Sequence, residues 1–223
     1  MSEKGNQAVK TVSFMMLITL FGKILGMVRE QLLAANYGTD MQAAAFLLAS
    51  RIPRTFFDVI FASAISASFI PVFVEYLQKK GRQEAFSLAN RFITMISTVT
   101  LLMMLLGMAF AKPLTLLIAP GYDVETVTLC VGLLRMLFPT MLFTAVAFSF
   151  VGILQSLEEF NVPAALSVVS NGVLILYYIF FNEKFGILGL TAAFLIGWAM
   201  QAVIQIPSLW KKGYHYRPDF HFK

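Results

Sequence analysis

Three charged side chains stand close together in an otherwise apolar stretch near the start of the chain. Lys23, Arg29 and Glu30 lie within residues 21–37, among Leu, Ile, Met and Val. The surrounding sequence is long and apolar enough to form a membrane-spanning helix. A Lys or Arg at the centre of such a helix costs roughly 2.5 to 3.5 kcal/mol. We therefore expect these charges to be paired, or to be used inside a polar cavity.

Further charges interrupt the apolar stretches later in the chain. Arg51, Arg54 and Arg135 are positive, and Asp58 is negative. Arg54 and Asp58 are four residues apart, a spacing at which they can neutralise each other on one helix. Arg51 and Arg135 are expected near span ends, where a long side chain can reach the lipid headgroups by snorkelling.

Cations outnumber anions within the apolar stretches. Lys23 and Glu30, seven residues apart on one helix face, can form a second pair, but pairing does not remove the surplus. Membrane cations without partners usually line a hydrated cavity, and Arg matches phosphate through paired donors. We therefore predict that Lys23, Arg29 and Arg54 point into one cavity for a phosphate-bearing amphiphile. Arg51 and Arg135 are further substrate-binding candidates, and Glu30 and Asp58 are assigned to orienting Arg29 and Arg54.

The composition places the chain in a membrane. It is 58% hydrophobic and 13% charged, with a mean hydropathy of +0.76, whereas soluble proteins are about 45–50% apolar and about 25% charged. Long unbroken apolar runs predict helices. The net charge of +5 is concentrated at segment ends, which is the pattern of membrane orientation rather than of a nucleic-acid surface, so no nucleic-acid partner is expected.

Enzymatic chemistry is not indicated. The chain has one cysteine, Cys130, and two histidines, which excludes an internal disulfide and argues against a metal site. No nucleophile–base pair and no glycine-rich phosphate loop is evident. We therefore expect neither an enzyme nor a bound metal or cofactor.

The apolar pattern predicts an all-α membrane protein, with residues 1–223 forming one bundle of about six transmembrane helices. As a straight helix, the second span would be about 55 Å long, against a hydrocarbon core of about 30 Å. We therefore predict a break near Pro53 or Pro71. The expected spans are 9–35, 41–77 (broken), 92–118, 127–157 (interrupted near Arg135 and Pro139), 162–181 and 187–209.

The distribution of Lys and Arg predicts the orientation. The N-terminus, the loop after the second span and the C-terminal tail hold most of the Lys and Arg, whereas the loops after the first and third spans are acidic. By the positive-inside rule, both termini are expected in the cytoplasm of a multi-pass membrane protein.

The segment 22–38, GKILGMVREQLLAANYG, resembles the first-helix signature of the MurJ/MviN family, the bacterial lipid II flippases of the MOP superfamily. Lys23 and Arg29 match the two cations of that signature, and Glu30 matches its acidic partner. The resemblance implies one lobe of a MOP/MATE-like transporter in the bacterial cytoplasmic membrane. It would move an undecaprenyl-diphosphate-linked peptidoglycan precursor by alternating access, with cations holding the diphosphate. Further matching segments are 69–71 with 75–76, 120–122, 137–139, and 161–163 with Asn171.

The chain also departs from the pattern of that family. An acidic position early in the second helix is Ala44 here, and a later Arg position is Phe57, one turn from Arg54. The acidic-glycine pair before the small-residue stretch is Ala62-Ser63. These differences leave open a flippase for another lipid-linked saccharide.

The resemblance covers only an amino-terminal lobe, because such flippases have two lobes. A cavity between lobes would need the missing second lobe or a second chain as partner. Two other readings remain open from the sequence. One is a MATE-like antiporter, which would favour surplus carboxylates in its cavity. The other is a non-transporting membrane scaffold subunit.

Overall fold

The structure is a computed structural model that describes residues 3–220, with side chains described for 12–61 and 63–220. The described residues form helices and no strand. Six helical segments among them are long and apolar enough to cross a membrane, which confirms the predicted all-α membrane fold. The α-helices are Glu3–Tyr37 (α1), Met41–Phe57 (α2), Ile70–Lys79 (α3), Arg82–Ala109 (α4), Ala111–Ile118 (α5), Val124–Leu137 (α6), Thr140–Ser156 (α7), Asn161–Ala164 (α8), Leu166–Phe180 (α9), Asn182–Val203 (α10) and Ile206–Lys211 (α11).

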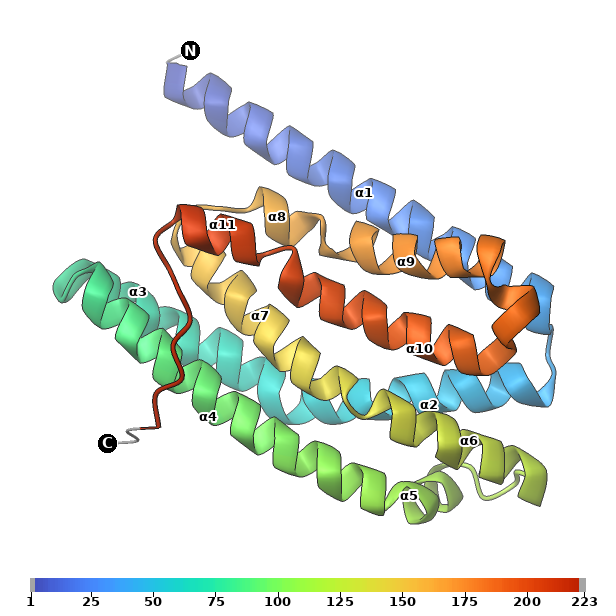
Figure 1. The fold of residues 1–223 in the computed structure, drawn as a ribbon. Coiled ribbons are helices and arrows are strands. Elements are labelled where there is room, and N and C mark those ends of the chain that lie inside the picture. The colour runs from blue at the N-terminus through green and yellow to red at the C-terminus, as the bar shows by residue number, and fades with distance from the viewer. Residues whose placement is uncertain (1–2, 221–223) are drawn as a thin grey trace.

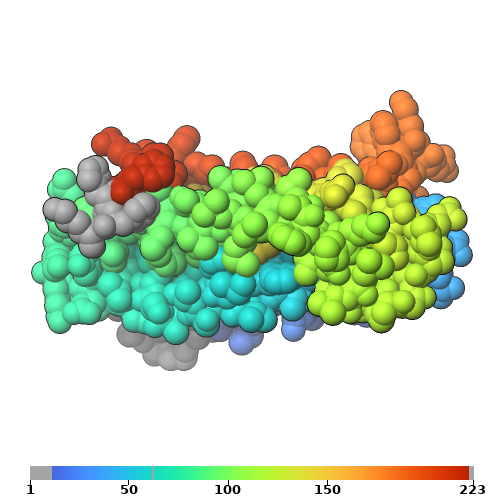
Figure 2. Space-filling view, turned by 90° about the horizontal axis from the view of Figure 1, so that it is seen from below, coloured from blue at the N-terminus to red at the C-terminus, as the bar shows by residue number. Residues whose placement is uncertain are grey.

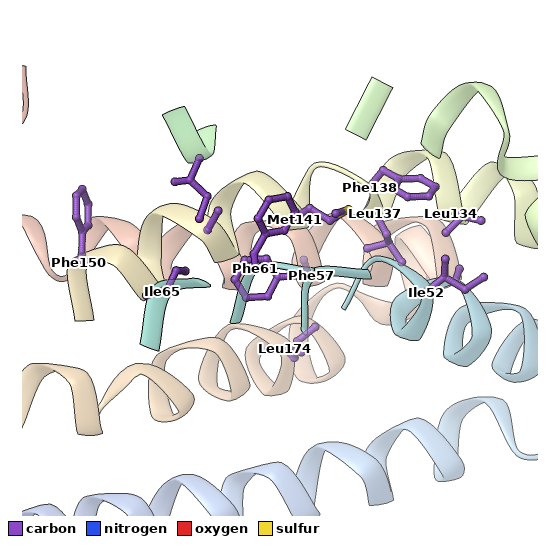
Figure 3. Packing of buried hydrophobic residues seen from close by; sticks show 14 of the residues in the cluster. Ile52, Phe57, Phe61, Ile65, Leu134, Leu137, Phe138, Met141, Phe150 and Leu174 are labelled. Carbon is purple, nitrogen blue, oxygen red and sulfur yellow. The ribbon is translucent and has the colours of Figure 1, made fainter. Parts of the chain in front are cut away.

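The core of the bundle is built around α6 and α7, whose span is the most buried of the six. α7 contacts α4 on one side and α10 on another, α6 contacts α2, and α9 covers α10. Leu137, Met141 and Ile153 are almost fully buried. Figure 3 shows the α6–α7 side chains meeting those of α2 and the segment after it, with Leu174 of α9 nearby. Small side chains allow this approach: a Cβ on Gly152 would lie 3.0 Å from Ile70.

α1 lies at the edge of the bundle, against α9. Figure 1 shows it diverging from the other helices toward its N-terminal end. The contact is close where the helices meet, because a Cβ on Gly22 would lie 2.2 Å from Ser167 Oγ. On the opposite side of the molecule, α4 and the α2–α3 span form the face seen in Figure 2, with α5 and α6 at one end.

The second span changes helix type between its two prolines. α2 gives way to π-helical segments at Asp58–Ala62 (η1) and Ala64–Phe69 (η2) before α3 begins. Pro53 lies inside α2, which continues to Phe57, so the helix does not end at this proline. Pro71 stands in the first turn of α3, directly after η2, and its missing N–H cannot continue the hydrogen-bond series of the preceding helical residues. The change of helix type therefore lies between the two prolines, from Asp58 to Phe69.

The third span differs from its predicted bounds of 92–118. α4 begins at Arg82, after Gly81 with φ +87°, and ends at Ala109. A separate helix, α5, continues from Ala111 to Ile118. The apolar run therefore covers two helices joined near Phe110. Hydropathy marks the part of a helix that lies in lipid, whereas backbone hydrogen bonds extend the helix through a polar first turn.

The later spans are also divided. α6 and α7 meet at Pro139, as expected, and residues 161–180 are split into α8 and α9. Within α10, Gly186 has φ +53° and ψ −145°, which breaks the helix before Ile187. Glycine is suited to this backbone conformation because it has no Cβ.

The connections alternate between the two ends of the bundle. The start of α1, the α3–α4 turn, the α7–α8 connection and the end of α11 lie at one end, and the α1–α2, α5–α6 and α9–α10 connections lie at the other (Figure 1). The segment after α11 returns along α4, where Tyr214 donates to Asn90 Oδ1 over 2.8 Å and Arg91 pairs with Asp219 over 2.9 Å. The predicted location of the termini concerns residues 1–2 and 221–223, which lie outside the described part.

Candidate functional site

A cavity of about 190 Å³ opens where α1, α2, α7, α9 and α10 approach one another. Arginine side chains occupy the α1 and α2 side, hydroxyl groups come from α2 and α7, and aromatic rings come from α2, α9 and α10. Charged groups and apolar walls therefore meet in one concave space, as is usual for binding sites. Its lining is Arg29, Glu30, Leu33, Phe46, Leu47, Ser50, Arg51, Pro53, Arg54, Thr140, Thr144, Leu174, Tyr178, Leu190, Phe194 and Trp198.

Arg29 connects α1 to α9. Its Nη2 forms an ion pair with Glu30 Oε1, and its Nη1 donates to Asn171 Oδ1 over 3.2 Å. Asn171 is buried, and its Nδ2 donates to the Gly22 carbonyl over 3.1 Å. Both terminal nitrogens of Arg29 are thus occupied within the lobe. The side chain is still 31% exposed, so it is not sealed away from solvent.

Arg54 is held differently. Its Nε lies 2.8 and 3.0 Å from the two carboxylate oxygens of Asp58. Its guanidinium carbon lies 5.3 Å from the Trp198 ring centroid and 5.8 Å from that of Phe148. Neither Nη atom donates to another described residue, and the side chain is 44% exposed. The edge of the guanidinium that could grip a phosphate is therefore uncommitted.

Arg51 lines the same cavity and is exposed, and it forms no ion pair with another described side chain. The neighbouring hydroxyl groups already donate to backbone carbonyls. Ser50 donates to Leu47 over 3.0 Å, and Thr144 donates to Thr140 over 2.7 Å. Arg51 is consequently the cavity cation with the most unused donors, five in all for a guanidinium.

Two of the predicted site residues lie elsewhere. Lys23 lines a surface groove formed by α1 alone, together with residues such as Met16 and Leu20. Arg135 donates from Nε to the Met108 carbonyl over 3.2 Å, so it satisfies an acceptor in the last turn of α4. The described cavity therefore contains Arg29, Arg51 and Arg54 but neither Lys23 nor Arg135.

The position aligned with a family Arg, Phe57, is fully buried in the core. Its ring packs 5.6 Å from that of Phe148, so it does not line the cavity, whereas Arg54 does. Sequence reasoning assigned no role to Asn171 or Trp198. As a polar residue inside an apolar span, Asn171 carried a signal of a possible role. The residues around Trp198, in contrast, do not distinguish it from an ordinary core aromatic. Among the described residues, no group of three or more metal-ligating side chains gathers.

The curated proteins that this chain resembles in sequence carry the same family name. The chain is 31% identical to the probable lipid II flippase MurJ of Buchnera aphidicola (subsp. Acyrthosiphon pisum) over 92% of its length, and 26% identical to the lipid II flippase MurJ of Burkholderia cenocepacia over 86%. These alignments cover 41% and 38% of the relatives. The chain thus spans about two fifths of the length of the curated relatives it matches.

Solved structures share the fold. A lipid II flippase MurJ in an inward closed conformation superposes with a TM-score of 0.76 at 27% identity, covering 91% of this chain and 42% of that one. A MOP superfamily transporter from Pyrococcus furiosus superposes with a TM-score of 0.72 at 14% identity, covering 95% and 47%, a likeness in fold alone. The family model described as lipid II flippase MurJ matches residues 33–223. This multi-pass membrane chain therefore belongs to the lipid II flippase MurJ family.

Proposed function

We propose that the chain is the amino-terminal lobe of a flippase that carries a lipid-linked saccharide diphosphate across the bacterial cytoplasmic membrane by alternating access. Lipid II, the undecaprenyl-diphosphate-linked peptidoglycan precursor, is the favoured substrate. The relatives above are named as a probable lipid II flippase and a lipid II flippase, and membership of their family supports this choice. A flippase moves its substrate without covalent chemistry, in keeping with the expectation that the chain is not an enzyme.

The observation that carries the proposal is the unbalanced positive charge of the cavity. Arg29, Arg51 and Arg54 line it, and Glu30 is the only carboxylate in the described lining. Glu30 is paired with Arg29, while Arg51 has no carboxylate partner among the described residues and Arg54 keeps both Nη atoms open. An uncompensated guanidinium in a membrane-spanning segment is costly unless it meets an anion. The cavity thus suits a diphosphate better than a neutral or cationic ligand.

The hydrogen bonds suggest different roles for the three arginines. Arg51 and Arg54 offer free donors, and we assign them to contacts with the phosphates. Arg29 holds α1 against α9 through Asn171 and pairs with Glu30, so one N–H on each of its Nη atoms is already used within the lobe. Glu30 and Asp58 orient Arg29 and Arg54. Lys23 shares a face of α1 with Glu30, two turns away, so it becomes a ligand contact only in a larger space completed from outside this lobe.

The cavity within the lobe is too small to enclose such a substrate. It measures about 190 Å³, whereas pockets that bury a drug-sized ligand measure about 300–1,000 Å³. The site therefore has to be completed by a second lobe or a second chain. The short share of the relatives that the chain covers fits this requirement.

The positive charge of the cavity also bears on the alternative functions. A MATE-like antiporter of cations would favour surplus carboxylates in its cavity, but the described lining has surplus arginines. A non-transporting scaffold subunit does not require uncommitted guanidinium groups in a cavity. A flippase for another lipid-linked saccharide remains compatible, because the cations would contact the diphosphate that such carriers share.

The test is a flipping assay with the protein in its full assembly, reconstituted into vesicles that contain fluorescent lipid II. Arg51→Gln and Arg54→Gln are each expected to slow flipping about tenfold or more, because a hydrogen bond to a charged group contributes about 1.5 to 3 kcal/mol. Arg82→Gln is the matched control, because Arg82 is exposed at the start of α4 and outside the cavity. Undiminished flipping in both cavity variants would contradict the proposal. A second lipid-linked saccharide, assayed in parallel, determines the substrate.

A further inference from the structure

Arg54 lies between aromatic rings from two other helices. Its guanidinium carbon is 5.3 Å from the Trp198 ring centroid on α10 and 5.8 Å from the Phe148 ring centroid on α7. Both distances fall within the roughly 6 Å reach of a cation–π attraction, for which Trp is the best partner. Trp198 also lines the arginine cavity itself, whereas Phe148 does not.

The ion pair with Asp58 does not fix the guanidinium by itself. Asp58 belongs to the same span as Arg54 and begins the π-helical segment η1. Its carboxylate contacts only Nε of Arg54, and both side chains are nearly half exposed. Such exposed pairs hold long side chains weakly. Trp198 and Phe148, in contrast, fix the group relative to α10 and α7, the helices that form the opposite wall.

Trp198 is itself supported by other rings. Its ring centroid is 6.2 Å from that of Phe194, which in turn packs edge-on against Phe46 at 5.7 Å. This series of rings runs from α10 to α2 along the cavity lining. A ring braced in this way is a stable platform, because its two side-chain torsions are restricted by its neighbours.

We propose that Trp198 is a positioning residue for Arg54: its ring face holds the guanidinium so that both Nη atoms stay open to the diphosphate of the carried lipid. The inference rests on the proposed function, which gives Arg54 its ligand, and it adds a residue to which the sequence analysis assigned no role. Asp58 occupies Nε, Trp198 covers a face, and the remaining edge has the fork geometry that matches a phosphate.

The test is a double-mutant cycle on binding of farnesyl diphosphate, a short polyprenyl diphosphate, to the full assembly in lipid nanodiscs, with farnesol as the uncharged control. Trp198→Leu is expected to weaken binding about threefold to tenfold, the range that corresponds to a partly desolvated cation–π contact. Trp198→Phe, which keeps a ring face, should lose less. In the Arg54→Gln background, Trp198→Leu should cause no further loss, because its effect acts through Arg54.

Trp198 also provides a spectroscopic readout. The chain has two tryptophans, so the fluorescence of Trp198 is isolated by subtracting the spectrum of Trp198→Phe. Farnesyl diphosphate should change this signal, and Arg54→Gln should abolish the change while leaving the thermal unfolding midpoint within a few degrees. A merely structural tryptophan would not respond to the ligand through Arg54.

The outcomes separate the two proposals. If Arg54→Gln weakens binding and neither Trp198 variant does, the positioning role is wrong and the proposed function stands. If Trp198→Leu weakens binding equally with and without Arg54, Trp198 acts on the ligand directly or on the fold, which also overturns the inference. If Arg54→Gln leaves binding unchanged, the assignment of Arg54 to the diphosphate fails, and the inference fails with it. Should Trp198→Leu not fold, Trp198→Phe completes the cycle.

Discussion

At the scale of single residues, three arginines in one cavity differ in how their donors are used. Arg29 has both Nη atoms bonded within the lobe, Arg54 has only Nε bonded, and Arg51 forms no ion pair with a described side chain. The same residue type therefore serves as a link between helices at one position and as an open anion donor at another. Asn171 makes this difference: from α9, its amide accepts a hydrogen bond from Arg29 and donates one to the Gly22 carbonyl, and both of these residues belong to α1.

Asn171→Ala should destabilise the contact between α1 and α9. The change removes the acceptor of Arg29 Nη1 and leaves the Gly22 carbonyl without its amide donor. The expected loss is about 0.6 kcal/mol for each hydrogen bond, the average between membrane helices, with a maximum of about 1.7 kcal/mol. Thermal unfolding in nanodiscs measures it. Asn161→Ala is the matched control, because the buried Oδ1 of Asn161 has no hydrogen-bond partner among the described residues. Equal losses in both variants would argue against a linking role for Asn171.

At the scale of elements, the ends and joints of helices depend on local chemistry that hydropathy does not show. Asp123 begins α6 as its N-cap: Oδ2 accepts from the backbone N–H groups of Glu125 over 3.1 Å and Thr126 over 3.2 Å. The Thr126 hydroxyl donates to Oδ1. These hydrogen bonds, the Thr126 hydroxyl first, lower the pKa of Asp123 below its ordinary value.

This cap predicts a pH dependence of stability. Because the folded pKa of Asp123 is lowered, the ionised form favours folding. Its contribution is complete above the unfolded pKa of about 3.9 and is lost as the pH falls through the folded pKa. In Asp123→Asn the amide still accepts hydrogen bonds but does not titrate, so the fall in unfolding midpoint between pH 6 and pH 3 should be smaller than in the parent. Thr128→Ala, a change in α6 that alters neither a titrating group nor the cap, should keep the slope of the parent. An unchanged slope in Asp123→Asn would refute the cap.

At the scale of the whole molecule, the charged residues near the two ends of the bundle predict its orientation in the membrane. The end of the bundle that contains the α3–α4 turn and the end of α11 carries Lys79, Lys80, Lys211 and Lys212. The other end has the acidic residues Asp40 and Asp123 in its connections. The positive-inside rule then predicts that the lysine-rich end faces the cytoplasm.

Cysteine labelling tests this orientation in intact cells. In a Cys130→Ala background, which removes the buried native thiol, Glu125→Cys should react with a membrane-impermeant maleimide from outside. Lys80→Cys should react only after the membrane is permeabilised. Thr39→Cys, in the α1–α2 connection, serves as a second external site. Labelling of Lys80→Cys in intact cells would reverse the predicted orientation.

The sequence by itself determined the class, the number of spans and the surplus of cations. Composition and run length are sufficient for these, because lipid requires long apolar helices and makes each charge inside them conspicuous. The spacing of two cations also weighed against the prediction that Lys23 and Arg29 line one cavity. Lys23 and Arg29 are six residues apart, which places them about 120° apart on a helix with 3.6 residues per turn, and in the structure Lys23 lines a separate groove.

Only the tertiary structure decided which charges meet. Arg51 and Arg54 come from α2, Arg29 comes from α1, and α9 and α10 close the space between them. Trp198 and Asn171 became functional candidates through helix crossings between segments more than a hundred positions apart, about which helix periodicity carries no information. The hydrogen bond from Arg135 to the Met108 carbonyl of α4 likewise depends on how two helices pack, which the sequence does not show. A sequence records which charges a membrane protein keeps, but the packing angle of each helix determines what each charge faces.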